Sequence, residues 1–585
     1  MNMKKLFILL ACCYMHQVAF SENTGKDATT FTFDVEQTPF SCYGAYMSLL
    51  VNHQDDADIL RLNDLTGRTF RGNLTNPMIE ITPVSANQPI PFKYQGTPVE
   101  MKGSAESGKM NCYFESPSIL HICLEGADLK LSGDWKNTVY RNVSPELGNT
   151  YIIGSNNIAL TAQKGKISYQ DNTFYIEKES DQVEIVIEQF YDLWQPKRYT
   201  EPRQTSLKRL TESFLEWEKH VPSVPQHLEK ARSLAAYRNW SAIYQPRENI
   251  TRPGMAVSKK GMMYIWSWDH CFHAMGLMYA QPQLAWDQFM IMFDHQNPVT
   301  GSLPDNISCK TQVLGYVKPP IHGWTLSHLL EHFNPGKEQL TLAYERLVKW
   351  THFWFDHRDK NKNGMPEYNH GYDSGWDNGT GFDMGFPLES PDLATFLILQ
   401  MNELSVLAAQ LDKPREAKAW KNKSGILLKK LLKDLWKGDK FIAKKIETGE
   451  NNPKSQSLIN YVPLLLGELL PQNIRAKLIS DLKRKDYLLT PFGLASESPQ
   501  SDLYEADGYW RGPIWAPSTM LVTEGLRKCG EEEFAKTVAA RFCNLCLTSG
   551  FSENFDALTG KPLRDSSISW TSSVFLILAH DYLMD

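Results

Sequence analysis

Acidic and aromatic residues stand next to one another in several segments of the second half of the chain. The clearest segments are 264–270, 373–378, 507–515 and 551–556. A sugar offers hydroxyl groups to carboxylates and apolar C–H faces to aromatic rings, so a cleft that mixes the two side-chain types suits carbohydrate binding. The alternative is that the tryptophans and tyrosines fill the core of a large helical protein. Because the aromatic residues stand beside acids, the pattern favours a sugar-binding cleft.

The chemistry of such a cleft is expected to come from carboxylates. The sequence contains no G-x-S-x-G, P-loop or H-E-x-x-H motif, which argues against the common serine hydrolases, nucleotide-binding enzymes and zinc proteases. His270 and His273 are better explained by helix packing than by metal binding.

The acidic-aromatic segments lie between predicted helices. From residue 226 onward, apolar periodicity predicts twelve helices, near 226–241, 269–281, 282–296, 322–333, 336–356, 391–411, 414–436, 456–469, 471–484, 513–529, 531–549 and 567–582. Tight turns alternate with long loops, and the clusters fall in the long loops. This alternation predicts an (α/α)6 barrel over 226–585. Its six long loops should open on one face, at the N-terminal ends of every second helix.

The first part of the chain follows a different pattern. Apolar and polar residues alternate at 31–35 and 183–187, which is typical of strands with one buried face. We therefore expect an antiparallel β-sandwich over 22–200. The helical spacing of Leu207, Leu210 and Phe214 predicts a linker helix within 201–225.

Length and composition agree with a division into two parts. A chain of 585 residues is too long for one core, and of its 16 tryptophans only Trp135 and Trp194 precede residue 200. The formal net charge is -6 and there is no basic block, which argues against a nucleic acid or an anionic membrane surface as a partner. The oligomeric state is not indicated.

Residues 1–21 resemble a secretory signal peptide, because Lys4 and Lys5 precede a short apolar run and small residues precede a cleavage point at Glu22. The run is too short to span a bilayer, and Cys12 leaves a lipoprotein signal as the less favoured alternative. We expect a periplasmic or secreted protein with no later membrane span.

Eight cysteines remain after the predicted signal peptide, without a paired C-x-x-C metal pattern, and Cys543 and Cys546 lie three residues apart on a predicted helix, which favours buried packing over zinc. Cys112 and Cys123 flank a hairpin-like stretch and could pair in an oxidising compartment.

Four motifs together resemble glycoside hydrolase family 63, the family of processing α-glucosidase I and its bacterial relatives. They are Tyr-Trp-Arg-Gly-Pro-Ile-Trp at 509–515, Ser-Gly-Trp-Asp-Asn at 374–378, Trp-Asp at 268–269 and Glu-Asn at 553–554. The resemblance covers 226–585, and bacterial members also carry an N-terminal β-sandwich. It implies an inverting, exo-acting α-glycosidase that removes terminal α-linked glucose from disaccharides or oligosaccharides.

The resemblance also implies residue roles, with Asp377 as the general acid and Glu553 as the general base. An inverting enzyme needs one protonated and one ionised carboxyl group, roughly 6.5–9.5 Å apart. Glu505 and Asp507 are the alternative bases. The expected substrate-binding residues are Trp266, Trp268, Asp269, Asp373, Trp376, Trp510, Arg511 and Trp515. At Asp373 the chain departs from the family, which often has Glu there.

Oxygen-bearing residues at alternate positions of 359–367 predict a calcium site. The expected ligands are Asp359, Asn361, Asn363, the Met365 carbonyl and Glu367, with Gly364 at the turn. The alternative is an ordinary Asn-Gly turn. Bacterial members of the family resemble this loop and bind calcium there, so we expect a structural ion that braces the loop leading to Asp377.

Other functions remain open. The same barrel could carry the specificity of a trehalase, an α-rhamnosidase or a mannosylglycerate hydrolase. A non-catalytic carbohydrate-binding protein and a helical-barrel sugar epimerase are less favoured. The linkage and the leaving group are not determined by the sequence.

Overall fold

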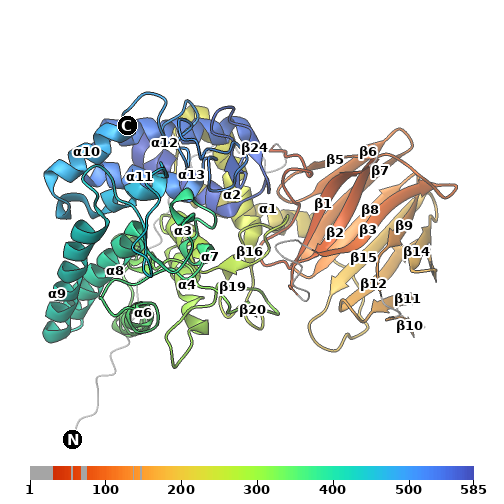
Figure 1. The fold of residues 1–585 in the computed structure, drawn as a ribbon. Coiled ribbons are helices and arrows are strands. Elements are labelled where there is room, and N and C mark those ends of the chain that lie inside the picture. Colours follow the sequence, from red (N-terminus) through yellow and green to blue (C-terminus); the bar gives the residue numbers. More distant parts are fainter. Residues whose placement is uncertain (1–30, 55–56, 68–75, 136–137, 145–147, 585) are drawn as a thin grey trace, which may run out of the picture.

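The computed structural model describes residues 31–584 except 55–56, 68–75, 136–137 and 145–147. The predicted signal peptide lies outside these residues. Within them, β-strands occupy the first part of the chain and helices the second, and the two parts lie side by side (Figure 1).

The N-terminal part contains two antiparallel sheets. The first consists of β1 (Met47–Gln54), β2 (Ala57–Asp64), β3 (Asn76–Ser85), β4 (Gln88–Pro89), β9 (Asp128–Ser132), β13 (Lys166–Gln170) and β14 (Thr173–Glu177). The second consists of β5 (Lys93–Gly96), β6 (Met101–Ala105), β7 (Gly108–Ser116), β8 (Ile119–Glu125), β10 (Val139–Ser144), β11 (Gly148–Ile153), β12 (Ile158–Lys164) and β15 (Gln182–Gln189).

Alternation along the strands explains why the two sheets share one core. Val183, Ile185 and Ile187 of β15 are buried, and so are Leu129 and Leu131 of β9 in the other sheet. All five belong to one hydrophobic cluster. The period-two pattern at 183–187 is therefore confirmed as a strand with an inward apolar face. The strand predicted from the same pattern at 31–35 is wrong, because in that segment only Phe33 forms an isolated bridge, with Gly96.

The suggested pairing of Cys112 with Cys123 is wrong. Both cysteines are free. In the β7–β8 ladder, Cys123 lies opposite Asn111 and Cys112 lies opposite Ile122. Successive side chains of a strand point to opposite faces, so the two thiols lie on different faces of the sheet.

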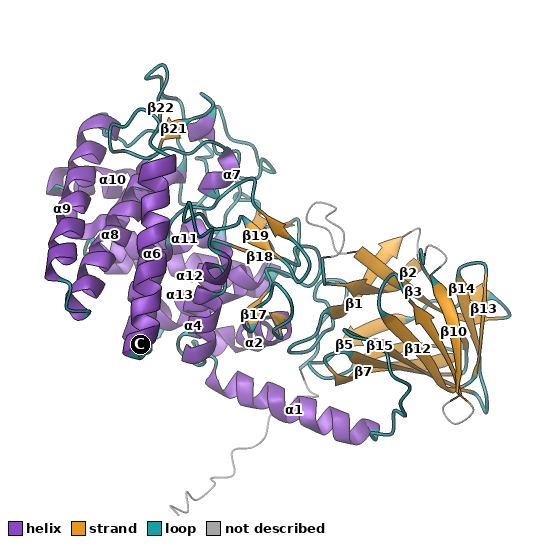
Figure 2. Cartoon of the chain, turned by 90° about the horizontal axis from the view of Figure 1, so that it is seen from below, coloured by secondary structure: helices purple, strands orange, loops and turns teal. Residues whose placement is uncertain are grey.

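The linker and the helices of the second part lie close to where periodicity predicts them. The linker is α1 (Arg203–His220), which packs against β7 and α2 and runs between the two parts (Figure 2). The remaining long helical elements are α2 (Glu229–Ala242), α3 (Asp269–Leu277), α4 (Pro282–Met290), α5 (His322–His332), α6 (Lys337–His357), α8 (Pro391–Gln410), α9 (Pro414–Lys430), η5 (Leu458–Leu469), α10 (Gln472–Leu482), α11 (Ala516–Lys528), α12 (Glu532–Ser549) and α13 (Ser569–Leu583).

Six of these elements pack in a closed cycle. α3 packs against α5, α5 against α8, α8 against η5, η5 against α11, α11 against α13, and α13 again against α3. The others lie outside the cycle, for example α4 against α3 and α9 against α8. The loops before the six inner elements are the long ones, and those before α3, α8, α11 and α13 carry the acidic-aromatic clusters.

One inner element differs from its prediction. The segment near 456–469 is a 3-10 helix, η5, and not an α-helix. Pro463 lies inside it, and Gly467 has a non-helical backbone with φ 52°. A proline cannot donate the backbone hydrogen bond of a regular α-helix, which accounts for the difference.

Among the described residues, only α8 is long and apolar enough to cross a membrane. It packs within the cycle between α5 and η5, and most of its side chains are buried there. The expectation that no later stretch is so apolar therefore needs correction, although α8 has the environment of a core helix.

Buried polar contacts fasten the sheets to the helical part. The Lys259 ammonium is buried and donates to the Ala45 carbonyl at 2.7 Å, and the Ser48 hydroxyl donates to the Lys259 carbonyl at 2.8 Å. The rings of Tyr46 and Tyr244 stack with centroids 4.5 Å apart. β1 is therefore held directly against the helical part.

Candidate active site

Two adjoining cavities lie at the end of the cycle where the long loops meet. The inner pocket has a volume of about 60 Å³ and is lined by Met262, Trp266, Trp268, Asp269, Lys318, Gly375, Asp377, Tyr509, Trp510, Trp515 and Trp570. The outer cavity has a volume of about 1130 Å³. It shares Met262, Trp266, Lys318, Asp377 and Tyr509 with the inner pocket and adds Glu553.

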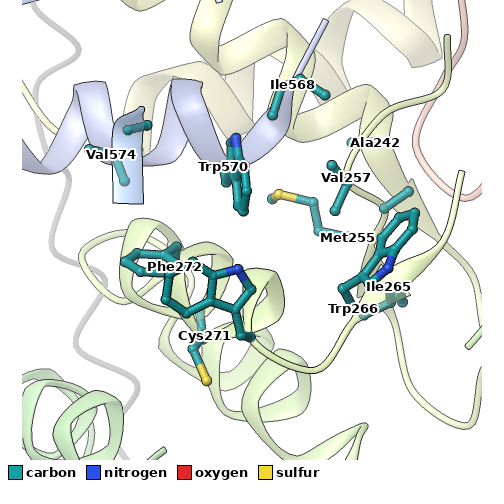
Figure 3. Packing of buried hydrophobic residues seen from close by; sticks show 14 of the residues in the cluster. Ala242, Met255, Val257, Ile265, Trp266, Cys271, Phe272, Ile568, Trp570 and Val574 are labelled. Carbon is teal, nitrogen blue, oxygen red and sulfur yellow. The ribbon is translucent and has the colours of Figure 1, made fainter. Parts of the chain in front are cut away.

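The inner pocket is built from the starts of the inner helices. Trp268 immediately precedes α3, Trp515 immediately precedes α11, and Trp570 is the second residue of α13. Figure 3 shows Trp570 among buried apolar residues that include Met255, Val257 and Phe272. This packing fixes the indole from behind.

The tryptophans brace one another. The rings of Trp510 and Trp515 stack with centroids 4.0 Å apart, and Trp570 meets Trp515 edge-on at 5.8 Å. Trp268 meets Trp570 edge-on at 6.3 Å. Rings held in this way form a rigid apolar surface that requires little ordering when a sugar stacks on it.

Two glycines let the Asp377 loop approach closely. Gly375 has φ 73°, and a Cβ there would lie 2.9 Å from the Trp268 ring. A Cβ on Gly371 would lie 1.7 Å from the Asp377 carbonyl oxygen. Both positions therefore need the small residue for conformational or packing reasons.

Lys318 balances a group of carboxylates around Asp377. Its ammonium lies 3.3 Å from Asp305 Oδ1 and 3.9 Å from Asp377 Oδ1, and it donates to the Tyr372 carbonyl at 3.0 Å. Burial raises the pKa of Asp377, while Lys318 opposes that shift. Burial likewise raises the pKa of Asp269 to about 8, again against Lys318.

Glu553 is buried, and it immediately precedes β23 (Asn554–Phe555) in the chain. Burial raises the pKa of its carboxyl to about 7, Asp565 raises it further, and a hydrogen bond from Tyr509 lowers it. Asp377 also raises it, so the two carboxyl groups influence each other electrostatically. Both expected catalytic residues thus line one cavity.

Three of the expected substrate-binding residues do not line either cavity among the described residues. Trp376 is buried with its ring centroid 4.7 Å from that of Trp510. Asp373 is buried, accepts from the backbone of Val317 and Asn369, and pairs with Arg358. These two residues support the site from behind.

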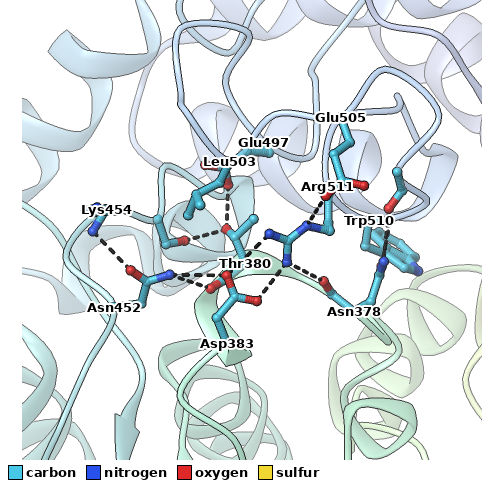
Figure 4. A network of polar contacts seen from close by, with 12 residues as sticks. Asn378, Thr380, Asp383, Asn452, Lys454, Glu497, Leu503, Glu505, Trp510 and Arg511 are labelled. Atoms are coloured by element: carbon cyan, nitrogen blue, oxygen red, sulfur yellow. Dashed lines mark hydrogen bonds and ion pairs between the residues drawn. The ribbon is translucent and has the colours of Figure 1, made fainter.

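Arg511 is the third such residue. Its guanidinium donates to Asp383 Oδ1 at 2.7 Å and to Glu505 Oε1 at 3.0 Å (Figure 4). It therefore holds the 509–515 loop onto the 377–383 loop and does not line the inner pocket.

Asn378 makes a second link between the same two loops. Its side-chain amide donates to the Gly508 carbonyl at 3.0 Å, and its side-chain oxygen accepts from the Trp510 backbone N–H at 3.0 Å (Figure 4). Because Asn378 follows Asp377 directly, this pair of bonds fixes Asp377 relative to Tyr509 and Trp510.

The alternative bases have other partners. Glu505 pairs with Arg511 and Asp507 pairs with Arg564, and both carboxylates are largely exposed. In the described part of the chain, neither lines the inner pocket or the outer cavity.

Sequence reasoning missed several residues that line the cavities. Lys318 and Tyr316 lie in a loop without periodicity, and Trp570 looked like a helix-core residue. Leu50, Asn52, Arg61 and Asn63 come from β1 and β2 in the N-terminal part. Asp305 lies in the long loop between α4 and α5, and only the fold places it beside Lys318.

The loop 359–367 has a donor set that fits a hard cation. Glu367 is buried, its Oε2 has no hydrogen-bond partner, and burial raises its pKa to about 7. Asp359 Oδ2 accepts from the Gly364 backbone at 2.9 Å, and Glu389 Oε1 accepts from the Asn363 amide at 2.6 Å. The buried Glu389 carboxylate is an additional acidic group that sequence reasoning missed.

A second group of possible metal ligands is better explained as core packing. His270, Cys271 and His322 bring their ligand atoms within 4.8 Å of one another. However, His322 Nδ1 accepts from the Trp350 indole at 3.2 Å, which places the proton of the neutral ring on Nε2, the other nitrogen. A protonated nitrogen cannot bind a metal.

The family profile described as mannosylglycerate hydrolase MGH1-like glycoside hydrolase domain matches residues 262–571. The chain is 22% identical over 410 residues to the mannosylglycerate hydrolase of Thermus thermophilus, an alignment that covers 56% of this chain and 97% of that one. It is 23% identical over 405 residues to the glucosylglycerate hydrolase of Mycolicibacterium hassiacum, covering 54% and 91%.

Solved structures with a similar fold include a mannosylglycerate hydrolase of Thermus thermophilus in complex with glucose, with a TM-score of 0.52 and 21% identity over 60% of this chain and 98% of that one. A bacterial glucoamylase in complex with acarbose has a TM-score of 0.62 and 10% identity over 94% of each chain. At these identities the likeness concerns the fold alone.

Proposed function

The chain belongs to glycoside hydrolase family 63 and carries its mannosylglycerate hydrolase MGH1-like domain, and from this premise we propose that it is an inverting, exo-acting α-glycosidase. We propose that it removes a terminal α-linked glucose from disaccharides or oligosaccharides. The observation that carries the proposal is that Asp377 and Glu553 line one cavity, beside a pocket walled by tryptophans.

In the proposed reaction, Asp377 is the general acid and Glu553 the general base. Asp377 donates its proton to the glycosidic oxygen as the bond from C1 to that oxygen breaks, and Glu553 takes a proton from the water that attacks C1 on the other face. The raised pKa of Asp377 favours the protonated form that an acid needs. The products are the free sugar with inverted anomeric configuration and the shortened leaving group.

The inner pocket, together with the adjoining part of the outer cavity that holds Glu553, is the proposed site of the terminal sugar. Its small volume and its tryptophan walls support an exo mode of action, because a chain could not continue through it. Asp269 would bind sugar hydroxyls. The positive charge of Lys318 would offset the repulsion among the neighbouring carboxylates of Asp269, Asp305 and Asp377.

We further propose that the closed cycle of helices is an (α/α)6 barrel over 226–585, behind a β-sandwich over 22–200 and a linker at 201–225. The cyclic packing of the six inner elements supports this assignment. A cleaved signal peptide at 1–21 and a periplasmic or secreted location remain proposals from the sequence.

We also propose a structural calcium ion at the loop 359–367. Asp359, Asn361, Asn363, the Met365 carbonyl and Glu367 would hold it. Glu389, which pairs with Lys444 at 2.8 Å, accepts from the Asn363 side-chain amide and would orient that ligand. The ion would hold this loop in shape upstream of Asp377 and would supply no chemistry to the reaction.

A second candidate function is hydrolysis of a hexosylglycerate. It is favoured by the names of the relatives, a mannosylglycerate hydrolase and a glucosylglycerate hydrolase. In this case the same carboxyl groups would act, and the outer cavity would receive a carboxylate-bearing leaving group.

Substitution of each carboxyl group tests the proposal. We expect Asp377→Asn and Glu553→Gln each to lower kcat on the preferred glycoside by about 10³-fold or more, with melting temperatures close to that of the wild type. Asp502→Asn and Glu533→Gln, which make the same chemical changes at exposed positions, are the matched controls. Full activity of either active-site variant would exclude its assigned role.

A further inference from the structure

The outer cavity is not built by the helical part alone. Leu50 and Asn52 of β1 and Arg61 and Asn63 of β2 line it together with residues of the long loops. We call these four residues the sheet wall. They lie outside residues 262–571, the part of the chain that matches the family profile.

The geometry of the strands explains why these four residues face the cavity. Leu50 lies directly opposite Arg61 in the β1–β2 ladder, and Asn63 lies opposite Ser48. Positions two residues apart share a face, so Leu50, Asn52, Arg61 and Asn63 all lie on the same side of the sheet. The alternate residues Leu49, Val51, Leu60 and Leu62 belong to the hydrophobic core on the other side.

The sheet wall is fixed relative to the carboxyl groups. The segment before β1 is bound to the helical part by the Gly44 N–H donating to the Ile243 carbonyl at 2.9 Å and by the buried Lys259 ammonium. Ser48, within β1, donates to the Lys259 carbonyl. Side chains at positions 50 and 52 are therefore presented by a rigid strand, which is what a specific subsite needs.

The charges of the outer cavity favour a neutral ligand. Arg61 Nη2 lies 2.9 Å from Glu80 Oε1, and the Lys260 ammonium donates to the Ser566 hydroxyl at 2.8 Å and to the Glu36 carbonyl at 2.7 Å. Asp305, Asp377, Glu553 and Asp565 add acidic groups to the same lining. Lys318 and Arg564 also line the cavity, so its four basic and four acidic side chains balance, and no excess positive charge attracts an anionic leaving group. A sugar hydroxyl can bind to Asn52, Asn63 and the tyrosines.

The volume favours a ligand longer than a disaccharide. The outer cavity alone, at about 1130 Å³, slightly exceeds the roughly 300–1,000 Å³ of typical small-molecule sites. The adjoining inner pocket, at about 60 Å³, is too small to enclose a whole sugar ring, so in the proposed function the terminal sugar extends into the outer cavity and the rest of that volume remains for the leaving group.

On the basis of the proposed function, we propose that the sheet wall binds the second and third sugar units of a neutral α-linked oligosaccharide, counted from the terminal sugar. These are the first two units of the leaving group. Asn52, which is half-buried, offers an amide group to sugar hydroxyls, and Asn63, 3% exposed, offers a second one deeper in the wall. Leu50, 5% exposed, adds a small apolar area beside them. The substrate class is then a neutral oligosaccharide of three or more units, and the N-terminal part is a component of substrate recognition.

A chain-length series tests the proposal. We expect kcat/KM of the wild type to rise from di- to tri- to tetrasaccharide for α-linked gluco-oligosaccharides of the preferred linkage. In the Asn52→Ala/Asn63→Ala double variant, the ratio of kcat/KM for the trisaccharide to that for an aryl α-glucoside should fall about tenfold. Asn544→Ala, the same change at an exposed position of α12, should leave this ratio unchanged.

A second variant covers the case in which the double variant does not fold. Asn52→Trp narrows the cavity at a half-buried position, and it should lower the same ratio at least as much. An unchanged ratio in a folded variant, or a wild type that shows no gain with chain length, would overturn the sheet-wall proposal. It would leave the proposed α-glycosidase activity intact.

Binding to an inactive protein separates this proposal from the proposed function. By calorimetry, Asp377→Asn should bind the trisaccharide more tightly than the disaccharide, and the added Asn52→Trp should abolish the difference. If the wild type cleaves no α-glucoside but this difference is present, the proposed function fails and the sheet wall stands. Equal affinities for the two sugars would refute the sheet wall. Tighter binding of a carboxylate-bearing glycoside than of the trisaccharide would show that the ligand is not neutral.

Discussion

The inner pocket and the outer cavity share five lining residues, yet they are built in opposite ways. The inner pocket is small, comes entirely from loops and helix starts of the helical part, and is walled by tryptophans that pack on one another. The outer cavity is many times larger and takes part of its lining from the first β-sheet. Recognition of the terminal sugar and the chemistry thus belong to the helical part of the chain, whereas binding of the leaving group depends on both the helical part and the N-terminal part.

The contrast can be sharpened by removing a group found only in the inner pocket. Asp269→Asn should lower kcat/KM about 100-fold on every glycoside, whatever its length, because the terminal sugar is common to all of them. Sheet-wall variants should instead act in a length-dependent way. Steady-state kinetics on an aryl α-glucoside and on the trisaccharide distinguish the two patterns. An effect of Asp269→Asn that depends on chain length would contradict the claim that the inner pocket recognises only the terminal sugar.

The pH profile of kcat/KM tests the two carboxyl groups assigned to catalysis and Lys318, which lies beside Asp377. Glu553 must be ionised to act as the base, and its pKa is raised to about 7, so kcat/KM should fall about tenfold per pH unit below that value. Lys318 opposes the rise in the pKa of Asp377. Lys318→Met should therefore let Asp377 keep its proton to higher pH and move the alkaline limb upward.

Lys318→Arg, which keeps the positive charge, is the control for that shift. If Lys318→Met lowered kcat/KM equally at every pH and left both apparent pKa values of the profile unchanged, the role assigned to Lys318 would be wrong.

The smallest effect is expected far from either cavity, at the loop 359–367. Chelation of calcium should lower the melting temperature by about 5 °C, and added calcium should restore it. Glu367→Gln should abolish this response, whereas Glu533→Gln should keep it. Differential scanning calorimetry with and without chelator measures the shift, and a wild type with no response to calcium would exclude the proposed ion.

Much of the fold could be predicted because periodicity is a local property. The twelve helices follow from apolar spacing, and α3 begins at Asp269 as expected. The exception, η5, contains Pro463 and Gly467, which change its backbone without changing its apolar pattern.

The site was predictable in composition but not in orientation. Trp376 and Asp377 are neighbours, yet only Asp377 reaches the cavity while Trp376 packs behind Trp510. The direction of Arg511 likewise depends on Asp383 and Glu505. Lys318 gave no signal, because a single lysine in a loop has no pattern, and the sheet wall depends on how two parts of the chain dock.

The most direct test of the central claim is the anomer of glucose that forms first. Proton NMR can follow hydrolysis of the preferred α-glucoside on a time scale shorter than mutarotation. An inverting reaction between Asp377 and Glu553 predicts that β-glucose appears first and the α anomer only later. If α-glucose appeared first, the reaction would retain configuration, and the roles assigned to these two carboxyl groups would be wrong.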